Sequence, residues 1–242
     1  YNQADELKTL KEYFPGYKNI YSQILQDVLR RVDKAFQNFF RRLKTSEKPG
    51  YPRFKGRGWY DSFTYPQSGF SLSDNHKGNQ RLKLFKIGNI KIKLHRGIKG
   101  IIKTCSVKRE LNNWYVCFAC ETKSELLPKA FRDVGIDVGI EKFAALSDGV
   151  LIYNPKFLRK SEAKLKSQQR SLSRKKKGSN SRKKQRNKLA KIHCKIKDQR
   201  NDFLHNESKK LIKNYDVIVF EDLKIKNMVK NHHLAKSISD AS

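Results

Sequence analysis

The sequence has no long hydrophobic run, and this absence excludes several classes of protein. Hydrophobic residues make up 37% of the 242 positions, and no segment has the apolar length of a membrane-spanning helix. No segment keeps the amphipathic face of a helix that lies on a membrane surface, and no signal peptide is recognisable. We therefore expect a protein without a membrane partner. Its length suits one large domain or two ordinary ones.

Cysteine is also scarce, with four residues scattered unevenly along the chain. Such a scatter is not typical of a secreted disulfide framework, so we expect a reducing, cytoplasmic compartment. Cys117 and Cys120 form a CxxC pair, but the flanking "NNWYVCFACETK" has the pattern of a strand. Strand positions three apart point to opposite faces, whereas a zinc knuckle needs a turn. Buried strand cysteines are therefore a better interpretation than a zinc site.

Acidic residues are few: 23 Asp and Glu stand against 54 Lys and Arg, which gives a net charge of +31. An enzyme for small molecules does not need this imbalance, and a folded chain so basic repels itself. A polyanionic partner is the simplest explanation. We expect that partner to be a nucleic acid, and an anionic membrane surface is the weaker alternative.

Residues 19–44 carry apolar side chains at steps of three and four, which predicts an amphipathic helix. The other face of this helix is polar and basic, so it is either a solvated face or a surface that meets phosphates. Gln26 is a candidate for reading a base edge, because a Gln side chain can form two hydrogen bonds with adenine. Arg30, on the polar face, is a candidate phosphate contact.

The loop 45–58, "TSEKPGYPRFKGRG", mixes basic and aromatic side chains. This mixture suits phosphate contact combined with stacking on bases or sugars. A basic loop pinned in place by its aromatic residues is an equally good interpretation. The candidate contacts are Arg53, Lys55 and Arg57.

Residues 60–125 have the alternation of strands, in "RLKLFKIGNIKIKLH", "IIKTCSVKRE" and "NWYVCFACET". The intervening "LNN" is a hairpin signal. We expect a small antiparallel barrel with a lysine-rich outer face. The segment 125–130 is then a linker, and a second domain begins near Phe131.

A long polar segment, 157–214, has helical spacing and is interrupted at "KKKGSNS". It contains no Asp or Glu from Lys164 to Lys197. A block of like charge is usually a solvated or disordered face. Because apolar residues at helical spacing flank this block, we favour a helical hairpin that presents cations to a nucleic-acid backbone. The candidate contacts are Arg174, Lys175, Lys176, Lys177, Arg182, Lys183, Lys184, Arg186, Lys188 and Lys191.

Two apolar segments far apart in the sequence each carry an acid: Asp137 in "DVGIDVGI" and Glu221 in "YDVIVFEDL". The second segment is apolar on both faces, as in a central buried strand. If the two strands are neighbours, the carboxylates converge at their ends, and Mg²⁺ can relieve their mutual repulsion. Taken singly, Asp137 has the alternative of a turn or capping role, and Glu221 that of a solvated acid at a strand end.

At this point the chain resembles a known family. "GIDVGIEKFAALSDG" is similar to the first nuclease motif of TnpB, the transposon-encoded RNA-guided DNA endonucleases related to type V CRISPR effectors. The segments "NFFRRLK", "GYPRFKGR", "SLSRKKKGS", "RNDFLH", "VIVFEDLKIKNM" and "LAKSISDAS" resemble further stretches of that family in the same order.

The resemblance implies an α+β multidomain protein. Residues 1–44 would end a helical recognition lobe, 45–130 would form a wedge β-barrel, and 131–242 would begin a RuvC-like nuclease domain of RNase H fold with a basic helical insertion. Asp137 and Glu221 match the first two catalytic carboxylates, which hold Mg²⁺ or Mn²⁺ in a two-metal endonuclease. The partners would be a guide RNA and double-stranded target DNA with a short flanking motif, in a bacterial or archaeal cytoplasm.

The sequence departs from that family in the region that should complete the site. The family has a zinc ribbon, which binds Zn²⁺, followed by a third catalytic Asp, and neither is recognisable here. Asp240 precedes the position of the ribbon and is not a candidate for the third ligand. We therefore expect a partial chain that is inactive alone. A nuclease-deficient, RNA-guided DNA-binding protein is the alternative.

Overall fold

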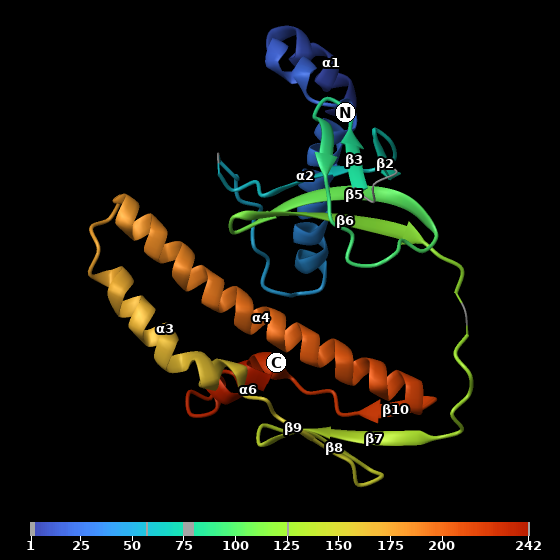
Figure 1. Cartoon of the computed structure of the whole chain (residues 1–242), viewed down its shortest axis with the longest axis vertical. Coiled ribbons are helices and arrows are strands. Elements are labelled where there is room, and N and C mark those ends of the chain that lie inside the picture. The colour runs from blue at the N-terminus through green and yellow to red at the C-terminus, as the bar shows by residue number, and fades with distance from the viewer. Residues whose placement is uncertain (1–2, 57, 75–79, 125, 242) are drawn as a thin grey trace. The chain divides into compact units, whose positions relative to one another are not determined.

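The computed structural model describes residues 3–56, 58–74, 80–124 and 126–241 (Figure 1). The chain divides into two compact units, Tyr1–Ser124 and Glu125–Ser242. Each unit combines helices with strands, which confirms the predicted α+β class. None of the described helices combines the length and the apolar character that crossing a membrane requires.

The first unit begins with helix α1 (Gln3–Tyr13), a 3₁₀ turn η1 (Pro15–Asn19) and helix α2 (Ser22–Lys44). The long α2 confirms the helix predicted from apolar spacing. Its basic face is not wholly solvated, because Arg31 donates to Thr64 Oγ1 at 2.8 Å and to the Ser62 carbonyl at 3.2 Å. These bonds tie α2 to the first strand.

The strands of this unit form two antiparallel sheets of three. One sheet has the order β1-β5-β6, from β1 (Ser62–Tyr65), β5 (Ile101–Glu110) and β6 (Asn113–Glu121). The other has the order β2-β3-β4, from β2 (Phe70–Asp74), β3 (Gln80–Leu84) and β4 (Gly88–Lys91).

The predicted closed barrel is wrong for the described residues, because no ladder of hydrogen bonds joins the two sheets. Instead they share one hydrophobic core, to which β1 contributes Tyr65, β3 contributes Leu82 and Leu84, and β5 contributes Cys105 and Val107. Burying both inner faces in this way needs packing but no closure.

One sequence run that alternates like a single strand is divided by a turn in the structure. The run "RLKLFKIGNIKIKLH" is two strands, β3 and β4, because the chain reverses at Lys86 (φ 68°) and Gly88 (φ 112°). The β5–β6 hairpin is confirmed, with Leu111 in its turn. Cys117 and Cys120 both lie in β6, as the strand interpretation predicted. Their predicted burial is wrong, because Cys117 is exposed and Cys120 is only half-buried.

The second unit is built on a four-stranded sheet with the order β10-β7-β8-β9. Strands β7 (Asp133–Val138), β8 (Lys142–Leu146) and β9 (Leu151–Tyr153) are antiparallel neighbours, which confirms the predicted hairpin and its turn. Strand β10 (Val217–Phe220) returns from the far end of the unit and pairs with β7 in parallel.

Between β9 and β10 lie two long helices, α3 (Phe157–Ser173) and α4 (Asn180–Asn214), which pack side by side (Figure 1). They confirm the predicted helical hairpin. Leu211 of α4 packs on the sheet beside Val134 and Ile218. The C-terminal part of α4 therefore covers one face of the sheet. Short helices α5 (Ile225–Met228) and α6 (Ala235–Ala241) follow.

The expectation that β10 is a central, buried strand is wrong within the described residues. It lies at the edge of the sheet, and Val217, Val219 and Phe220 are 50%, 62% and 69% exposed. An apolar composition on both faces indicates that a strand is suited to burial. It does not show whether another element packs on each face. Here only the face toward α4 is covered.

Helix α3 is capped from a distant part of the chain. Its N-cap residue, Lys156, offers no side-chain cap, and the buried Asp240 of α6 accepts from the amides of Leu158 at 2.8 Å and Arg159 at 3.2 Å. Asp240 also pairs with Arg200 of α4 at 2.9 Å. One carboxylate thus satisfies orphan amides of α3 and joins three helices.

Replacing Asp240 should destabilise the second unit. Asp240→Asn keeps the size of the side chain but removes the charge that pairs with Arg200. We expect the free energy of unfolding to fall by about 2 kcal/mol, because hydrogen bonds to a charged group are lost. Chemical denaturation measures this change. The matched control is Asp202→Asn on exposed α4 surface, for which a change beyond about 0.5 kcal/mol is not expected.

The stability that Asp240 contributes should depend on pH. Burial alone would raise the pKa of Asp240, but the hydrogen bonds it accepts outweigh this effect and hold its pKa below the usual range. A depressed carboxyl pKa stabilises the fold above the unfolded value of about 3.9, and this stability is lost as pH falls through the folded pKa. The stability difference between wild type and Asp240→Asn should therefore be constant near neutral pH and shrink in acid. A constant difference down to acid pH would contradict this role.

Candidate functional site

Asp137 and Glu221 come to the same edge of the sheet. In the parallel pairing of β7 with β10, Ile136 lies opposite Phe220. Asp137 is the next residue on β7, and Glu221 is the first residue after β10. Parallel strands end at the same edge, so the two acids occupy equivalent positions there. The adjacency that the sequence hypothesis required is confirmed. The joint action of the two carboxylates stays a prediction.

Asp137 is exposed although it lies in a largely apolar strand. Side chains alternate along a strand, and Val134 and Ile136 pack in the core beside α4. Asp137 therefore belongs to the opposite face, which α4 does not cover. Glu221 is exposed as well. Neither carboxylate bears the cost of burial that the apolar sequence context suggested.

The turn after Asp137 requires a glycine. A Cβ at Gly139 would lie 2.9 Å from the carbonyl oxygen of Lys142, closer than such contacts allow. The amide of Gly139 donates to the Phe143 carbonyl, and the Asn154 side chain donates to the Ile140 carbonyl at 2.9 Å. These contacts hold the β7–β8 turn, so Asp137 lies next to a fixed end of the strand.

Side chains at the opposite end of the β7–β10 pair fix its register. Asp216 accepts from the amides of Ala130 at 3.0 Å and Phe131 at 2.7 Å, just before the two strands begin. Asp148, in the β8–β9 turn, accepts from the Tyr215 hydroxyl and pairs with Arg132 at 3.0 Å. Register matters here because a shift of one residue would move the side chains of β10 to the other face.

The sequence interpretation missed Asp148 and Asp216 as structural residues. The hydrogen bond from Tyr215 is the main cause that holds the pKa of Asp148 below its usual value, and it raises the pKa of Tyr215. The only local signal was the Ser-Asp-Gly turn, which gives no indication of the partner.

The acids at the sheet edge fit part of a metal site. Carboxylate oxygens are the hard ligands that Mg²⁺ and Mn²⁺ prefer. Within the described ranges, however, no group of three or more His, Cys, Asp or Glu side chains is placed to hold a metal ion. Asp240 does not add a ligand, because its oxygens are used by α3 and Arg200.

The basic residues predicted to contact nucleic acid lie in both units. In the first, Gln26 is half-buried on α2, and Arg30, Arg53 and Lys55 are exposed, whereas Arg57 lies outside the described residues. Their contact with nucleic acid stays a prediction.

In the second unit the predicted contacts lie in the turn between α3 and α4 and along the first turns of α4. Those that are exposed are Arg174, Lys176, Lys177, Lys183, Lys184, Arg186, Lys188 and Lys191. Lys175 is half-buried.

Arg182 differs from its basic neighbours. It is half-buried, and its guanidinium donates to the carbonyl oxygens of Leu172 at 2.8 Å and Lys175 at 2.9 Å. The Leu172 carbonyl lies in the last turn of α3, and the Lys175 carbonyl lies in the turn that follows the helix. Arg182 therefore closes the hairpin from within.

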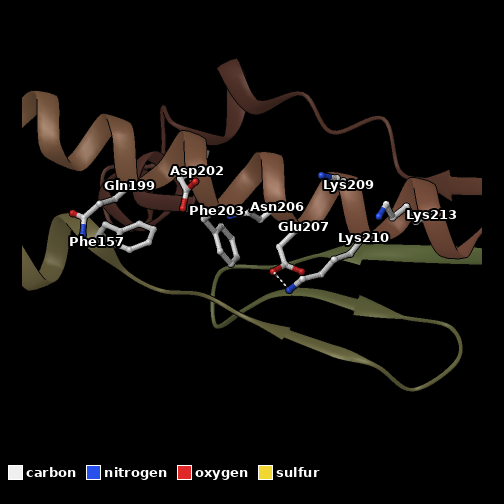
Figure 2. Close-up of a pocket in the computed structure, with 9 residues that line it drawn as sticks. All are labelled: Phe157, Gln199, Asp202, Phe203, Asn206, Glu207, Lys209, Lys210 and Lys213. Atoms are coloured by element: carbon white, nitrogen blue, oxygen red, sulfur yellow. Dashed lines mark hydrogen bonds and ion pairs between the residues drawn. The ribbon is translucent and has the colours of Figure 1, made fainter. Parts of the chain in front are cut away.

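A groove of about 570 Å³ runs along the C-terminal half of α4. Figure 2 shows the rings of Phe157 and Phe203 beside each other there, with centroids 6.3 Å apart. Glu207 and Lys210 on its wall pair with each other at 2.7 Å. Neither Asp137 nor Glu221 lines this groove, so it is separate from the acids at the sheet edge.

Comparison with known proteins places the chain among proteins of mobile elements. Residues 115–232 match the family model OrfB_IS605, described as "Probable transposase". The chain is 37% identical to "Putative RNA-guided DNA endonuclease InsQ" of Escherichia coli K12 over 212 residues, covering 87% of this chain and 50% of the relative. It is 36% identical to "Putative RNA-guided DNA endonuclease" of Streptomyces pristinaespiralis over 247 residues, covering 100% of this chain and 57% of the relative.

The chain belongs to the TnpB family. It spans about half the length of the curated relatives it matches. The matched region includes Asp137, Glu221 and the helical hairpin.

Removing the Tyr215 hydroxyl should change the titration of Asp148. In Tyr215→Phe the pKa of Asp148 should rise toward its ordinary value, because the hydrogen bond that is the main cause of its depression is lost. Carboxyl-carbon NMR across a pH titration measures this shift. Tyr153→Phe, at a 70% exposed tyrosine of β9, is the matched control and should leave Asp148 unchanged. An unchanged Asp148 in Tyr215→Phe would show that the hydroxyl is not its partner in solution.

Proposed function

We propose that this chain provides the nucleic-acid-binding surface and two catalytic carboxylates of an RNA-guided, metal-dependent DNA endonuclease associated with a transposon. The observation that carries the proposal is the position of Asp137 and Glu221 at equivalent ends of neighbouring parallel strands. The names of the two relatives support RNA-guided DNA cleavage as the reaction class.

Asp137 and Glu221 are the residues that would hold the metal. Two divalent ions at such a site supply an activated water and stabilise the leaving oxygen of the phosphodiester. The two acids lie exposed on strand ends, so their oxygens are available to a cation. The glycine turn at Gly139 and the register contacts of Asp216 would keep the acids in place as substrate binds.

The charge of the chain supports nucleic-acid partners. In such a system a guide RNA reads the target DNA by base pairing, and the protein contacts backbone and a short flanking motif. The net charge of +31 suits this task, because each phosphate that a cation neutralises releases counterions. The proposed contacts are the hairpin cations from Arg174 to Lys191, apart from Arg182, which closes the hairpin, and Gln26, Arg30, Arg53, Lys55 and Arg57 of the other unit.

A nuclease-deficient, RNA-guided DNA-binding protein is the second candidate. It is favoured by one observation: the described residues bring two acids to the sheet edge but form no set of three potential metal ligands. Such a protein would act as a repressor or a roadblock. Cleavage by the wild-type protein decides between the candidates.

Neutralising either acid should abolish cutting and preserve binding. Asp137→Asn and Glu221→Gln keep the side-chain size and remove the charge that attracts the cation. We expect DNA cleavage to fall by at least about a hundredfold, since metal ligation and transition-state stabilisation are both lost. The assay uses the protein as its gene encodes it, with its co-purified RNA, target DNA and Mg²⁺.

The matched control is Asp133→Asn, at the first residue of β7 and away from the proposed site. It should cut like wild type. Survival of cutting in Asp137→Asn would overturn the site assignment. A wild-type protein that binds its target and does not cut in Mg²⁺ or Mn²⁺ would support the binding-only candidate.

A further inference from the structure

The side of α3 that faces away from α4 carries a polar groove of about 730 Å³. On the opposite side of α3, Leu165 is buried and Gln168 hydrogen-bonds to Gln185 of α4. With 3.6 residues per turn, positions 163, 167, 170, 171 and 174 cluster on the side away from those contacts. We refer to this surface as the α3 groove, which is lined by Ala163, Lys166, Ser167, Arg170, Ser171, Arg174 and Lys175.

The cations of the α3 groove are poorly neutralised. Lys166 pairs with Glu162 at 2.9 Å, but within the described part of the chain Arg170, Arg174 and Lys175 have no acidic partner. Lys166, Arg170 and Arg174 follow one another at intervals of four residues, a spacing at which like charges destabilise a helix. A bound polyanion would remove this repulsion.

Two serine hydroxyls in the α3 groove are also free. Ser173 and Ser179 nearby donate to backbone carbonyls, of Arg170 at 2.9 Å and Lys176 at 2.8 Å. By contrast, neither Ser167 nor Ser171 has a hydrogen-bond partner among the residues that the structure describes. The α3 groove thus combines positive charge with hydroxyls that can both donate and accept.

A further positive side chain, that of Arg182, lies at the end of the α3 groove. The C-terminus of a helix carries unpaired carbonyls and the negative end of the helix dipole, which would repel a phosphate beside Arg174. Arg182 hydrogen-bonds the carbonyls of Leu172 and Lys175 at this end. The positive charge of Arg182 therefore offsets part of the negative end of the helix dipole beside Arg174.

We propose that the α3 groove binds the sugar–phosphate backbone of an RNA strand. Arg170, Arg174 and Lys175 bind phosphates by charge-assisted hydrogen bonds. Ser167 and Ser171 bond to ribose 2′-hydroxyls, the group that distinguishes RNA from DNA. This assignment rests on the proposed function, because it gives a particular surface to the RNA partner.

The charge contribution is tested by salt dependence. The protein is freed of co-purified RNA, and the binding of a labelled single-stranded RNA is followed by fluorescence anisotropy at several salt concentrations. In the double variant Arg170→Gln and Arg174→Gln, affinity should fall by about tenfold or more. The slope of log affinity against log salt should fall by about 1.4, since each phosphate contact to a single strand contributes about 0.7.

The matched control removes two charges elsewhere, through Lys8→Gln and Lys18→Gln at exposed positions of the first unit. It should retain most of the affinity and the salt slope. Equal losses in the two double variants would overturn the α3 groove as a contact surface.

The hydroxyl contribution is tested by comparing RNA with DNA. The double variant Ser167→Ala and Ser171→Ala should bind the RNA several-fold more weakly with an unchanged salt slope. It should bind single-stranded DNA of the same sequence like wild type. Alanine favours helix more than serine, so unfolding of α3 would not explain the loss. Equal weakening for RNA and DNA would overturn the selection of RNA, and no weakening would overturn the role of the hydroxyls.

The two proposals fail in different ways. If wild type binds RNA and cuts its target but the arginine variant binds like the control, the α3 groove is wrong and the proposed function stands. If wild type binds RNA through the α3 groove but does not cut, the nuclease proposal is wrong and the groove stands. A wild type that binds no RNA would overturn both.

Discussion

The parallel pairing of β10 with β7 is the constraint on which the second unit depends. Parallel neighbours require a crossover, and here the chain between them supplies the β8–β9 hairpin and the basic helices α3 and α4. One pairing therefore determines where the long α4 lies and which acids become neighbours. It also explains why contacts at Asp148 and Asp216 gather at the start of the pair, since register there sets the positions of Asp137 and Glu221.

Charge is distributed unevenly along the second unit. Its basic residues and the two acids of the proposed site lie in different parts of the unit, an arrangement that suits a polyanionic substrate. The turn of the hairpin and the adjacent halves of α3 and α4, from Lys164 to Lys197, contain many Lys and Arg residues and no Asp or Glu. Asp137 and Glu221 are exposed at the sheet edge. A polyanion held by the hairpin would otherwise be repelled by such acids, and a divalent cation between acids and phosphate removes the conflict. The proposed binding surface and the proposed cleavage site would then act on the same substrate.

Local features of the fold were predictable from sequence, and long-range ones were not. Apolar periodicity predicted α2, α3 and α4, and turn signals predicted the β5–β6 and β8–β9 hairpins. The predicted barrel was wrong because alternation reports that a strand has a buried face, without stating whether sheet edges join. The burial of β10 was overestimated for a related reason. Its composition shows that both of its faces are apolar enough to be buried, but the described chain covers only one of them.

The sequence by itself determined the type of most elements, and it predicted a polyanionic partner and the two acids worth testing, because periodicity, charge and motif spacing are local properties. Only the tertiary structure decided that β7 and β10 are parallel neighbours and that Asp137 is exposed. It also decided that Asp240 caps α3 and that Arg182 closes the hairpin. Each of these depends on groups that the chain brings together from distant positions. Their hydrogen bonds and register are set by packing between distant segments, so the sequence of any single segment does not predict them.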